Sequence, residues 1–470
     1  MGRSLARRLV ALLLAVLALG GAAGCSEKDR SVSKPPAKHD AANGTNGQGA
    51  PGSSDGAGST STGTGRSDAS AGGGAPTGPG LPGGSGAPAP GRSSETTARA
   101  GRAAGPERPR GWRTIAGSPL SGRHSHSAVW TGREMIVWGG AWRAGNAAIY
   151  LDDGAAYDPA TNRWRRLPPS PLAPRADHVA AWTGREMLVW GGNPGTETPY
   201  GPNEFVDGAA YDPARNRWRP MADFPLGPRY GARAVWTGKL LVVWGGARAE
   251  DGEDPPRRSD GAAYDPATNR WTVLPPSPLP GRVGALAAPT ARGVLFSWGI
   301  AQGRKAAPES AFYDPSTRRW SAAAAAPPTD TGWCLDLSGC VGVDAGDRVL
   351  FAGEGLTYDP ATGQWAGLPP NPFADPLRDG KAVVWTGQRA LLWGGGTYEG
   401  ESDSYPSKVT GEPGAAYDPL SRRWEPLLPG PLAPRARGRA VWTGEEMLAW
   451  GGESAQDKRV QYADGAAYTQ

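Results

Sequence analysis

The sequence predicts an all-β domain in residues 111–470, built from seven copies of one unit and preceded by a long disordered linker. Three observations support this prediction. A pattern of Trp, Gly-Gly, Tyr-Asp-Pro and Trp returns about every 51 residues, as in repeat architectures. Most of the 20 Trp residues fall in three columns of that repeat. Residues 26–110 contain no Trp, Tyr or Phe, so they cannot bury enough apolar surface to fold.

Each unit contains four short β-prone segments separated by turn residues. In the first unit the first segment ends at Trp130, and the second ends at Trp138 before Gly139-Gly140. The third ends at Tyr157-Asp158-Pro159, and the fourth begins at Trp164. We expect the glycine pair to adopt positive φ or to allow a close approach of two backbones. We expect the Trp of the fourth segment to fill the gap between units.

The aligned residues recur in fixed order along the chain. The Tyr column is Tyr157, Tyr211, Tyr264, Tyr313, Tyr358, Tyr417 and Tyr468. The Trp expected before the glycine pair is Trp138, Trp190, Trp244, Trp298, Trp393 and Trp450. The copies around Trp298-Gly299 and Phe351-Ala352-Gly353 are the weakest.

This order of Gly-Gly, Tyr-Asp-Pro and Trp resembles the kelch motif, and the resemblance covers essentially all of residues 111–470. Kelch units form four-stranded blades of a β-propeller. The resemblance therefore implies a seven-bladed kelch β-propeller of the superfamily that includes galactose oxidase. The period of the repeat agrees with the kelch period of roughly 50 residues.

The seventh unit lacks its own fourth strand, because the chain stops at Gln470 soon after Tyr468. A matching segment, Trp112-Arg-Thr-Ile-Ala116, stands before the first unit. We therefore predict that residues 112–116 pair with the last blade and close the ring. Closure of this kind removes the exposed edges of the sheet.

The N-terminus predicts export and a lipid anchor. Residues 1–24 have a basic start, an eleven-residue apolar run from Leu9 to Leu19 and a small-residue stretch, as in a secretory signal peptide. The run is too short to span a bilayer as a helix. The small residues before Cys25 resemble the bacterial lipobox, which implies lipidation of Cys25; an ordinary cleaved signal with a spare Cys is the alternative. The chain is then a membrane-anchored lipoprotein at the bacterial cell envelope.

Residues 25–110 form a predicted disordered tether, rich in Gly, Ser, Pro and Ala. The formal charge of +5 arises before the repeats, since residues 1–111 carry +6 and the remainder carries −1. A nearly neutral propeller gives no reason to expect nucleic-acid binding. We expect a monomer that needs no cofactor.

Two charged columns flank the glycine pair on one face of the predicted propeller. The arginines precede the first strand and are Arg123, Arg175, Arg229, Arg282, Arg378 and Arg435. The carboxylates stand four residues before the Tyr column and are Asp153, Asp207, Asp260, Glu309, Glu354 and Asp464. The arginines predict either a funnel that attracts anionic ligands at the axis or charge-assisted bonds that lock the strand starts.

Long second-to-third-strand loops lie on the same face, at residues 141–152, 193–206, 247–259, 396–412 and 453–463. Long loops on a rigid scaffold commonly carry function. Trp142, Tyr200 and Tyr398 are therefore candidate ligand-binding residues, suited to stacking on sugars or binding peptides. The alternative is that these aromatic side chains cap the core locally.

Few residues could hold a metal ion. His126 and His178 occupy one column of adjacent units, where a structural role competes with metal ligation. Galactose oxidase needs copper held by two His and two Tyr, with one Tyr cross-linked to a Cys, and this sequence shows no matching set. Cys334 and Cys340 lie six residues apart, which in an exported protein predicts a small-loop disulfide.

No phosphate-binding loop or Ser-His-Asp pattern is present in the sequence. We therefore expect a binding module that presents its variable loops to a protein or glycan at the cell envelope. The alternative is a carbohydrate-active kelch enzyme of the mutarotase or epimerase type, which would use an Arg-lined axial pocket. A scaffold for cell-envelope assembly is a third hypothesis.

Overall fold

The computed structural model of the chain describes residues 109–144, 147–194, 205–248, 255–304, 308–327, 342–373, 379–396, 414–454 and 460–470. These residues belong to one unit, Thr97–Gln470, which is described by itself. The predicted signal peptide, Cys25 and the tether up to residue 108 lie outside the described residues. So do Tyr200, Arg378, Tyr398 and both cysteines of the predicted disulfide. Within the described residues, no helix is long and apolar enough to cross a membrane.

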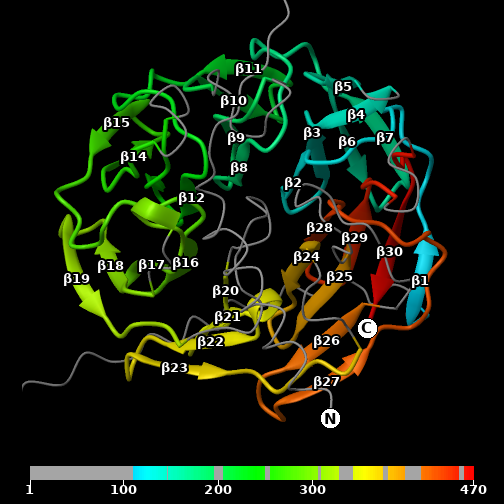
Figure 1. The fold of residues 1–470 in the computed structure, drawn as a ribbon. Coiled ribbons are helices and arrows are strands. Elements are labelled where there is room, and N and C mark those ends of the chain that lie inside the picture. Colours follow the sequence, from blue (N-terminus) through cyan, green and yellow to red (C-terminus); the bar gives the residue numbers. More distant parts are fainter. Residues whose placement is uncertain are drawn as a thin grey trace, which may run out of the picture. The chain divides into compact units, whose positions relative to one another are not determined.

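The described chain folds into seven four-stranded antiparallel sheets, one for each repeat unit, arranged in a ring (Figure 1). Blade 1 comprises β2 (Ser127–Trp130), β3 (Met135–Trp138), β6 (Gly154–Asp158) and β7 (Arg163–Arg166). Blade 2 comprises β8 (Val179–Trp182), β9 (Met187–Trp190), β10 (Gly208–Asp212) and β11 (Arg217–Pro220). Blade 3 comprises β12 (Arg233–Trp236), β13 (Leu241–Trp244), β14 (Gly261–Asp265) and β15 (Arg270–Val273). Blade 4 comprises β16 (Leu286–Thr290), β17 (Gly293–Ser297), β18 (Ser310–Asp314) and β19 (Arg319–Ala323).

The remaining blades follow the same order, with a shortened first strand in blade 5. Blade 5 comprises β20 (Val343–Asp344), β21 (Val349–Phe351), β22 (Leu356–Asp359) and β23 (Gln364–Gly367). Blade 6 comprises β24 (Asp379–Trp385), β25 (Ala390–Gly396), β26 (Ala415–Asp418) and β27 (Arg423–Pro426). Blade 7 comprises β28 (Arg439–Trp442), β29 (Glu446–Trp450), β30 (Gly465–Thr469) and β1 (Gly111–Thr114). Two short 3-10 helices are η2 (Gln302–Arg304) and η3 (Ala352–Glu354).

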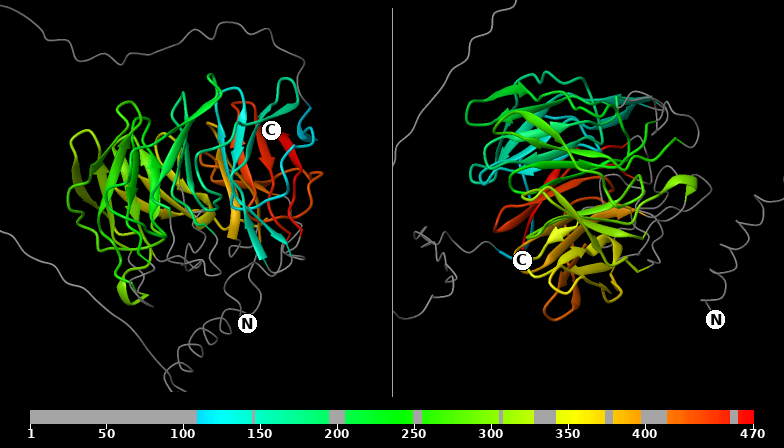
Figure 2. Two further views of the ribbon diagram at one scale, coloured as in Figure 1. Left: turned by 90° about the horizontal axis from the view of Figure 1, so that it is seen from above. Right: turned by 90° about the vertical axis from the view of Figure 1, so that its left-hand side faces the viewer.

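The predicted closure of the ring is confirmed. Strand β1 pairs antiparallel with β30, and Trp112 lies opposite Tyr468. The Ile115 N–H extends this pairing by donating to the Gly465 carbonyl over 3.3 Å. In Figure 1 the cyan β1 lies beside the red β30, although more than 350 residues of chain separate them. The first strands of successive blades contact one another in a closed cycle, from β2 through β28 and back to β2. Figure 2 shows this ring from two further sides.

The Trp that opens each fourth strand joins its blade to the blade before it. Trp164 of blade 1 packs against Trp450 of blade 7, with the ring centroids 5.9 Å apart. Its indole N–H donates to the Ala116 carbonyl, in the connection that leaves blade 7, over 2.9 Å. All seven blades make this hydrogen bond; the other donors are Trp112, Trp218, Trp271, Trp320, Trp365 and Trp424. The predicted role of these residues between units is thus confirmed.

The glycine pair is required by a close approach and by backbone conformation. Gly139 and Gly140 have φ of 66° and 97°, a region that side chains with a Cβ rarely adopt. A Cβ on Gly140 would lie 2.7 Å from the His124 carbonyl oxygen. One alignment of this column is wrong: Trp298 has φ 48° and takes the place of the first glycine, so Ser297 precedes the pair in blade 4. The Trp298 side chain packs in the core of the blade 4 and blade 5 junction.

We expect Trp112→Ala to destabilise the propeller by about 3 kcal/mol, because the substitution removes a large side chain from the closing junction. Trp112 contacts Trp393 and Tyr468, and its indole N–H donates to the Leu428 carbonyl. Urea denaturation measures the change in the free energy of unfolding. Leu420→Ala is the control, because Leu420 is 93% exposed, and it should change stability by less than about 0.5 kcal/mol. Equal stability of the two variants would contradict closure by β1.

Candidate functional site

The strand order gives the propeller two different faces. One face carries the loops between second and third strands together with the connections between blades, and we call it the long-loop face. The other carries the turns between first and second strands and between third and fourth strands, and we call it the short-turn face. In blade 1 these turns are only Thr131–Glu134 and Pro159–Asn162, flanked by strand ends. Most of the length variation between units therefore falls on the long-loop face.

On the long-loop face the two charged columns form ion pairs within each blade. Arg175 Nη1 donates to Asp207 Oδ1 over 2.8 Å and to the carbonyl of Gly191, the first glycine of the pair, over 3.1 Å. Five blades repeat this Arg–carboxylate pair. The pairs are Arg123–Asp153, Arg175–Asp207, Arg229–Asp260, Arg282–Glu309 and Arg435–Asp464. Each guanidinium thus joins the start of the first strand to the loop before the third.

These arginines are inside the protein and their carboxylate partners are outside. Arg123, Arg175 and Arg282 have no exposed area, whereas Asp207 keeps 48% of its side chain exposed. Aromatic rings cover two guanidinium groups: Phe205 lies 3.8 Å from Arg175 and Tyr462 lies 3.9 Å from Arg435. Burial lowers the pKa of Arg282 to about 10, which leaves it charged at neutral pH.

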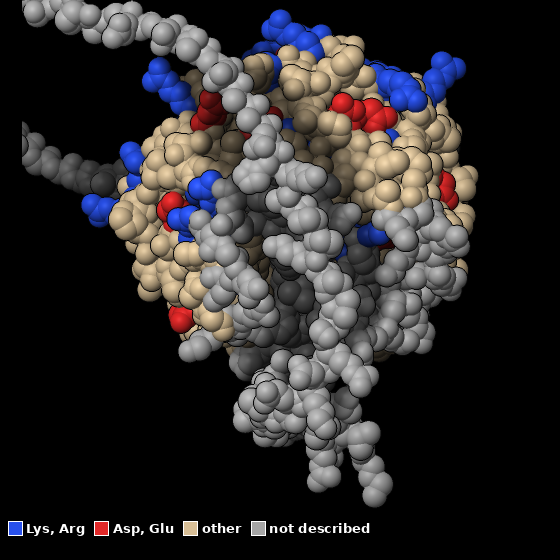
Figure 3. All heavy atoms as spheres, turned by 45° about the horizontal axis from the view of Figure 1, so that its top comes forward, with Lys and Arg blue, Asp and Glu red and all other residues tan. Residues whose placement is uncertain are grey.

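This geometry supports the locking role that the sequence suggested for the two columns, and it does not supply an anion funnel. Arg123, Arg175, Arg229, Arg282 and Arg435 present no free guanidinium to a ligand at the axis, because burial and the paired carboxylate enclose each one. Phe205, an aromatic residue of a long loop, likewise caps the protein locally by covering Arg175. The Lys, Arg, Asp and Glu side chains in Figure 3 are interspersed on the visible described surface.

The long loop of blade 1 contains a hairpin that the sequence did not predict. Strands β4 (Ala141–Ala144) and β5 (Ala147–Tyr150) pair antiparallel and extend beyond the blade. Trp142 is half-buried on this hairpin, and Ile149 opposite it is 40% exposed. The hairpin is tied to blade 7, since the Arg143 N–H donates to Gln461 Oε1 over 3.2 Å. An apolar surface on a fixed element is the kind of feature that binds a partner.

A buried charged cluster lies beside this hairpin, between blades 7 and 1, and sequence reasoning missed it. His124 Nε2 is 3.5 Å from Glu453 Oε2, and Arg437 Nη1 is 3.3 Å from Glu453 Oε1. Glu453 is only 3% exposed. Burial lowers the pKa of His124, although the Glu453 carboxylate opposes this effect. No repeated pattern pointed to Glu453, because the residues at the equivalent bridge positions of other blades are uncharged: Ala141, Asn193, Ala247 and Ile300.

His126 and His178 pack against the glycine pairs of the preceding blades. The His178 ring lies edge-on to Trp138, and His178 Nε2 is 2.8 Å from Ser127 Oγ. Burial, reinforced by the charges of Arg175 and Arg439, lowers the pKa of His178 to about 3, so the ring is neutral at pH 7. The described residues contain no group of three or more His, Cys, Asp or Glu side chains placed to hold a metal ion.

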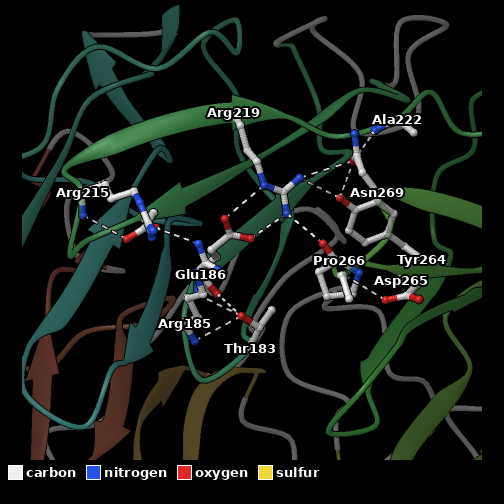
Figure 4. A network of polar contacts seen from close by, with 12 residues as sticks. Thr183, Arg185, Glu186, Arg215, Arg219, Ala222, Tyr264, Asp265, Pro266 and Asn269 are labelled. Atoms are coloured by element: carbon white, nitrogen blue, oxygen red, sulfur yellow. Dashed lines mark hydrogen bonds and ion pairs between the residues drawn. The ribbon is translucent and has the colours of Figure 1, made fainter.

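The short-turn face carries a second set of contacts, which join neighbouring blades (Figure 4). Arg219 of blade 2 donates to both carboxylate oxygens of Glu186 over 3.0 and 2.6 Å. Its third nitrogen donates to Tyr264 Oη of blade 3 over 3.1 Å, and Tyr264 donates to Asn269 Oδ1 over 2.7 Å. We call this arrangement the Arg–Glu–Tyr–Asn clamp.

The clamp recurs in some blades and changes in others. Arg165, Glu134, Tyr211 and Asn216 form it between blades 1 and 2. Arg113 and Glu446 pair at the same positions in blade 7, over 2.7 Å. Blade 6 reverses the charges, because Arg389 stands at the Glu position and Glu425 at the Arg position, 2.7 Å apart. Blade 6 thus keeps an ion pair at these two positions with the charges exchanged.

Comparison with known proteins identifies the repeat. The family model for the KLHDC2/KLHL20/DRC7 Kelch-repeats domain matches residues 110–281, which contain blades 1 to 3 and the closing strand. The Kelch-like protein terF of Aspergillus terreus is 33% identical over 134 residues, which cover 27% of this chain and 28% of that protein.

Two further relatives are equally partial matches. Human Kelch domain-containing protein 3 is 30% identical over 139 residues, covering 28% of this chain and 35% of that protein. The N-acetylneuraminate epimerase of Brucella suis is 30% identical over 131 residues, covering 26% of this chain and 32% of that protein. The chain thus spans about a third or less of the length of these relatives.

We expect Arg175→Met to destabilise the propeller by about 3 kcal/mol, because it leaves buried carbonyl groups without a donor. The matched control is Arg163→Met, which makes the same change at an exposed arginine and should cost less than about 0.5 kcal/mol. The free energies of unfolding come from urea denaturation of both variants. If Arg175→Met were as stable as the control, the locking role would be wrong and a ligand-binding role would regain support.

Proposed function

We propose that this chain, whose residues 111–470 form a seven-bladed kelch-repeat β-propeller, is an exported binding module held at the cell envelope by a lipid on Cys25. Its long-loop face receives a protein partner. One observation carries this proposal: the hairpin β4–β5 holds Ile149 exposed and Trp142 half-buried on a rigid ring. Trp residues in partly apolar patches supply a large share of binding energy in protein interfaces.

The locked charges of the long-loop face favour recognition through its loops. Five arginines are enclosed by their own carboxylates, so they are not available to hold an anionic ligand at the axis. The half-exposed carboxylates and the aliphatic hairpin remain at the surface. Exposed carboxylates beside an apolar hairpin are complementary to a protein surface with apolar and basic groups. They are less complementary to a compact acidic sugar. A glycan that stacks on Trp142 is the other outcome, and a glycan array with the full chain separates the two.

A carbohydrate-active enzyme of the mutarotase or epimerase type is the second candidate. The similarity to a protein named N-acetylneuraminate epimerase supports it. The Arg-lined pocket is not part of this candidate, because the five described arginines are paired. The buried His124 and Glu453 beside the hairpin would have to supply the proton-transfer groups. NMR of a sugar incubated with the chain separates the two candidates. An enzyme of this type changes the anomer or epimer ratio of the sugar, whereas a binding module leaves that ratio unchanged.

We expect a photoreactive amino acid at position 149 to cross-link the partner on cells that produce the chain. The matched control is the same amino acid at position 420, which is exposed on the short-turn face. A cross-linked species should form from position 149 and not from position 420. Adding Trp142→Ala should lower the yield at position 149, because it removes the adjoining aromatic surface. Cross-links from position 420 alone would contradict binding on the long-loop face.

We expect Cys25→Ser to release the chain from the membrane fraction, because the thioether-linked lipid supplies its attachment. Ser26→Ala, one residue away, is the control and should leave the chain in the membrane fraction. Fractionation followed by labelling with an alkyne fatty acid measures both effects. A Cys25→Ser chain that stays in the membrane fraction would exclude this anchor.

A further inference from the structure

The junction between blades 3 and 4 lacks the clamp of the short-turn face. Leu240 stands where Glu186 stands in blade 2, since the Thr237 N–H donates to the Leu240 carbonyl as Thr183 does to Glu186. Thr272 stands where Arg219 stands, directly after the Trp of the fourth strand. Both charged members of the clamp are therefore absent from blade 3.

Loss of these two long side chains leaves a cavity of about 490 Å³ at this junction. Leu240 and Thr272 line it from blade 3, and Tyr313, Pro315 and Arg318 line it from blade 4. Its size lies within the range of roughly 300–1,000 Å³ that is typical of small-molecule sites. The cavity thus occupies the space that the Arg219–Glu186 pair fills at the preceding junction.

The lining carries more positive than negative charge. Lys239, Arg270 and Arg318 line the cavity together with a single carboxylate, that of Asp265. Among the described residues, neither Lys239 nor Arg270 has an ion pair or a side-chain hydrogen bond. The glutamate that neutralises the clamp in blade 2 has no counterpart here, because Leu240 replaces it.

Arg318 is the cationic residue that blade 4 contributes to the cavity, opposite Lys239 and Arg270 of blade 3. It occupies the left-handed turn position that is Asn269 in blade 3, with φ of 57° and 53° respectively. Arg318 Nη2 donates to the Val273 carbonyl over 3.3 Å, which holds the side chain across the junction. Burial raises the pKa of Tyr313, although the Arg318 guanidinium opposes this, so the phenol keeps its proton.

We propose that this cavity on the short-turn face binds a compact ligand through a carboxylate group, which takes the place of the missing glutamate. Arg318 and Lys239 would pair with the carboxylate, and the hydroxyl groups of Thr268 and Thr272 offer further hydrogen bonds. A cationic ligand would meet three like charges, and an apolar ligand would leave them unpaired. The site lies on the face opposite the proposed partner surface and does not depend on that proposal.

Isothermal titration of the full chain tests the site with glucuronate as the charged probe and glucose as its uncharged match. N-acetylglutamate α-amide, tested beside its glutamine analogue, provides the same comparison for an acidic amino-acid side chain. Each acid should bind at least about tenfold more tightly than its neutral match. Binding of either acid supports the proposal and shows whether a sugar or a side chain is the better source of the carboxylate.

Two variants locate the binding at this junction. Leu240→Glu combined with Thr272→Arg rebuilds the clamp of blade 2 and fills the cavity, so it should abolish binding without lowering the thermal unfolding midpoint. Arg318→Asn installs the residue found at the equivalent turn position in blades 1, 2 and 3. It removes the cation without backbone strain and should weaken binding at least about tenfold.

The control is Arg133→Gln, which removes an exposed cation of blade 1 from the turn position that Lys239 occupies in blade 3 and should leave binding unchanged. Arg318→Asn decides the question if the double variant does not fold, because its backbone conformation is one that Asn adopts readily. Equal affinity for the acids and their neutral matches would overturn the proposal. Wild-type affinity in Arg318→Asn or in a folded double variant would overturn it as well.

Discussion

The ring depends on one repeated contact, in which the Trp at the start of each fourth strand packs on the preceding blade and donates its indole N–H to that blade's outgoing connection. An indole offers a large apolar face and a single donor, so it can fill the junction without leaving a buried polar atom unpaired. The contact persists where the repeat is weakest. In blade 5 the first strand has only two residues, yet Trp365 still packs against the core shared with Leu295 and Phe312 of blade 4 and donates to the Ala324 carbonyl over 2.9 Å.

The two faces use charge differently, and burial explains the difference. On the long-loop face each guanidinium is buried within its own blade while the carboxylate keeps contact with water, which limits the cost of taking two charges out of solvent. Backbone carbonyls such as that of Gly191 accept further hydrogen bonds from these guanidinium groups. On the short-turn face Arg219 and its equivalents are partly exposed and bridge to the next blade. The first set fixes the shape of a blade, and the second fixes neighbouring blades against each other.

Periodic features could be predicted from the sequence and solitary ones could not. Trp112 and Tyr468 predicted the closing pair because seven Tyr residues had only six Trp partners downstream of them. The Gly-Gly column was predicted because the pair recurs from unit to unit. Its one misalignment lies in blade 4, where Trp298 adopts a positive φ that is typical of glycine. The hairpin β4–β5 and the His124–Glu453 contact occur once, so no column revealed them. Spacing along the chain does not show in which direction a side chain points. It therefore could not decide whether Arg175 lines an anion-attracting funnel or pairs with a carboxylate.

The ion pairs explain why the net charge of the propeller does not predict which ligands it prefers. Residues 112–470 sum to −1, a value that alone predicts no preference for anions or cations. Pairing within blades and between blades cancels many charges locally, so the potential at any point depends on the cations that have no carboxylate partner there. Such an imbalance arises where one repeat column loses a carboxylate and another gains a cation, as when Leu240 takes the place of a glutamate and Arg318 takes the place of an asparagine. Selectivity in this fold is therefore created by exceptions to the repeat, because the regular positions neutralise one another.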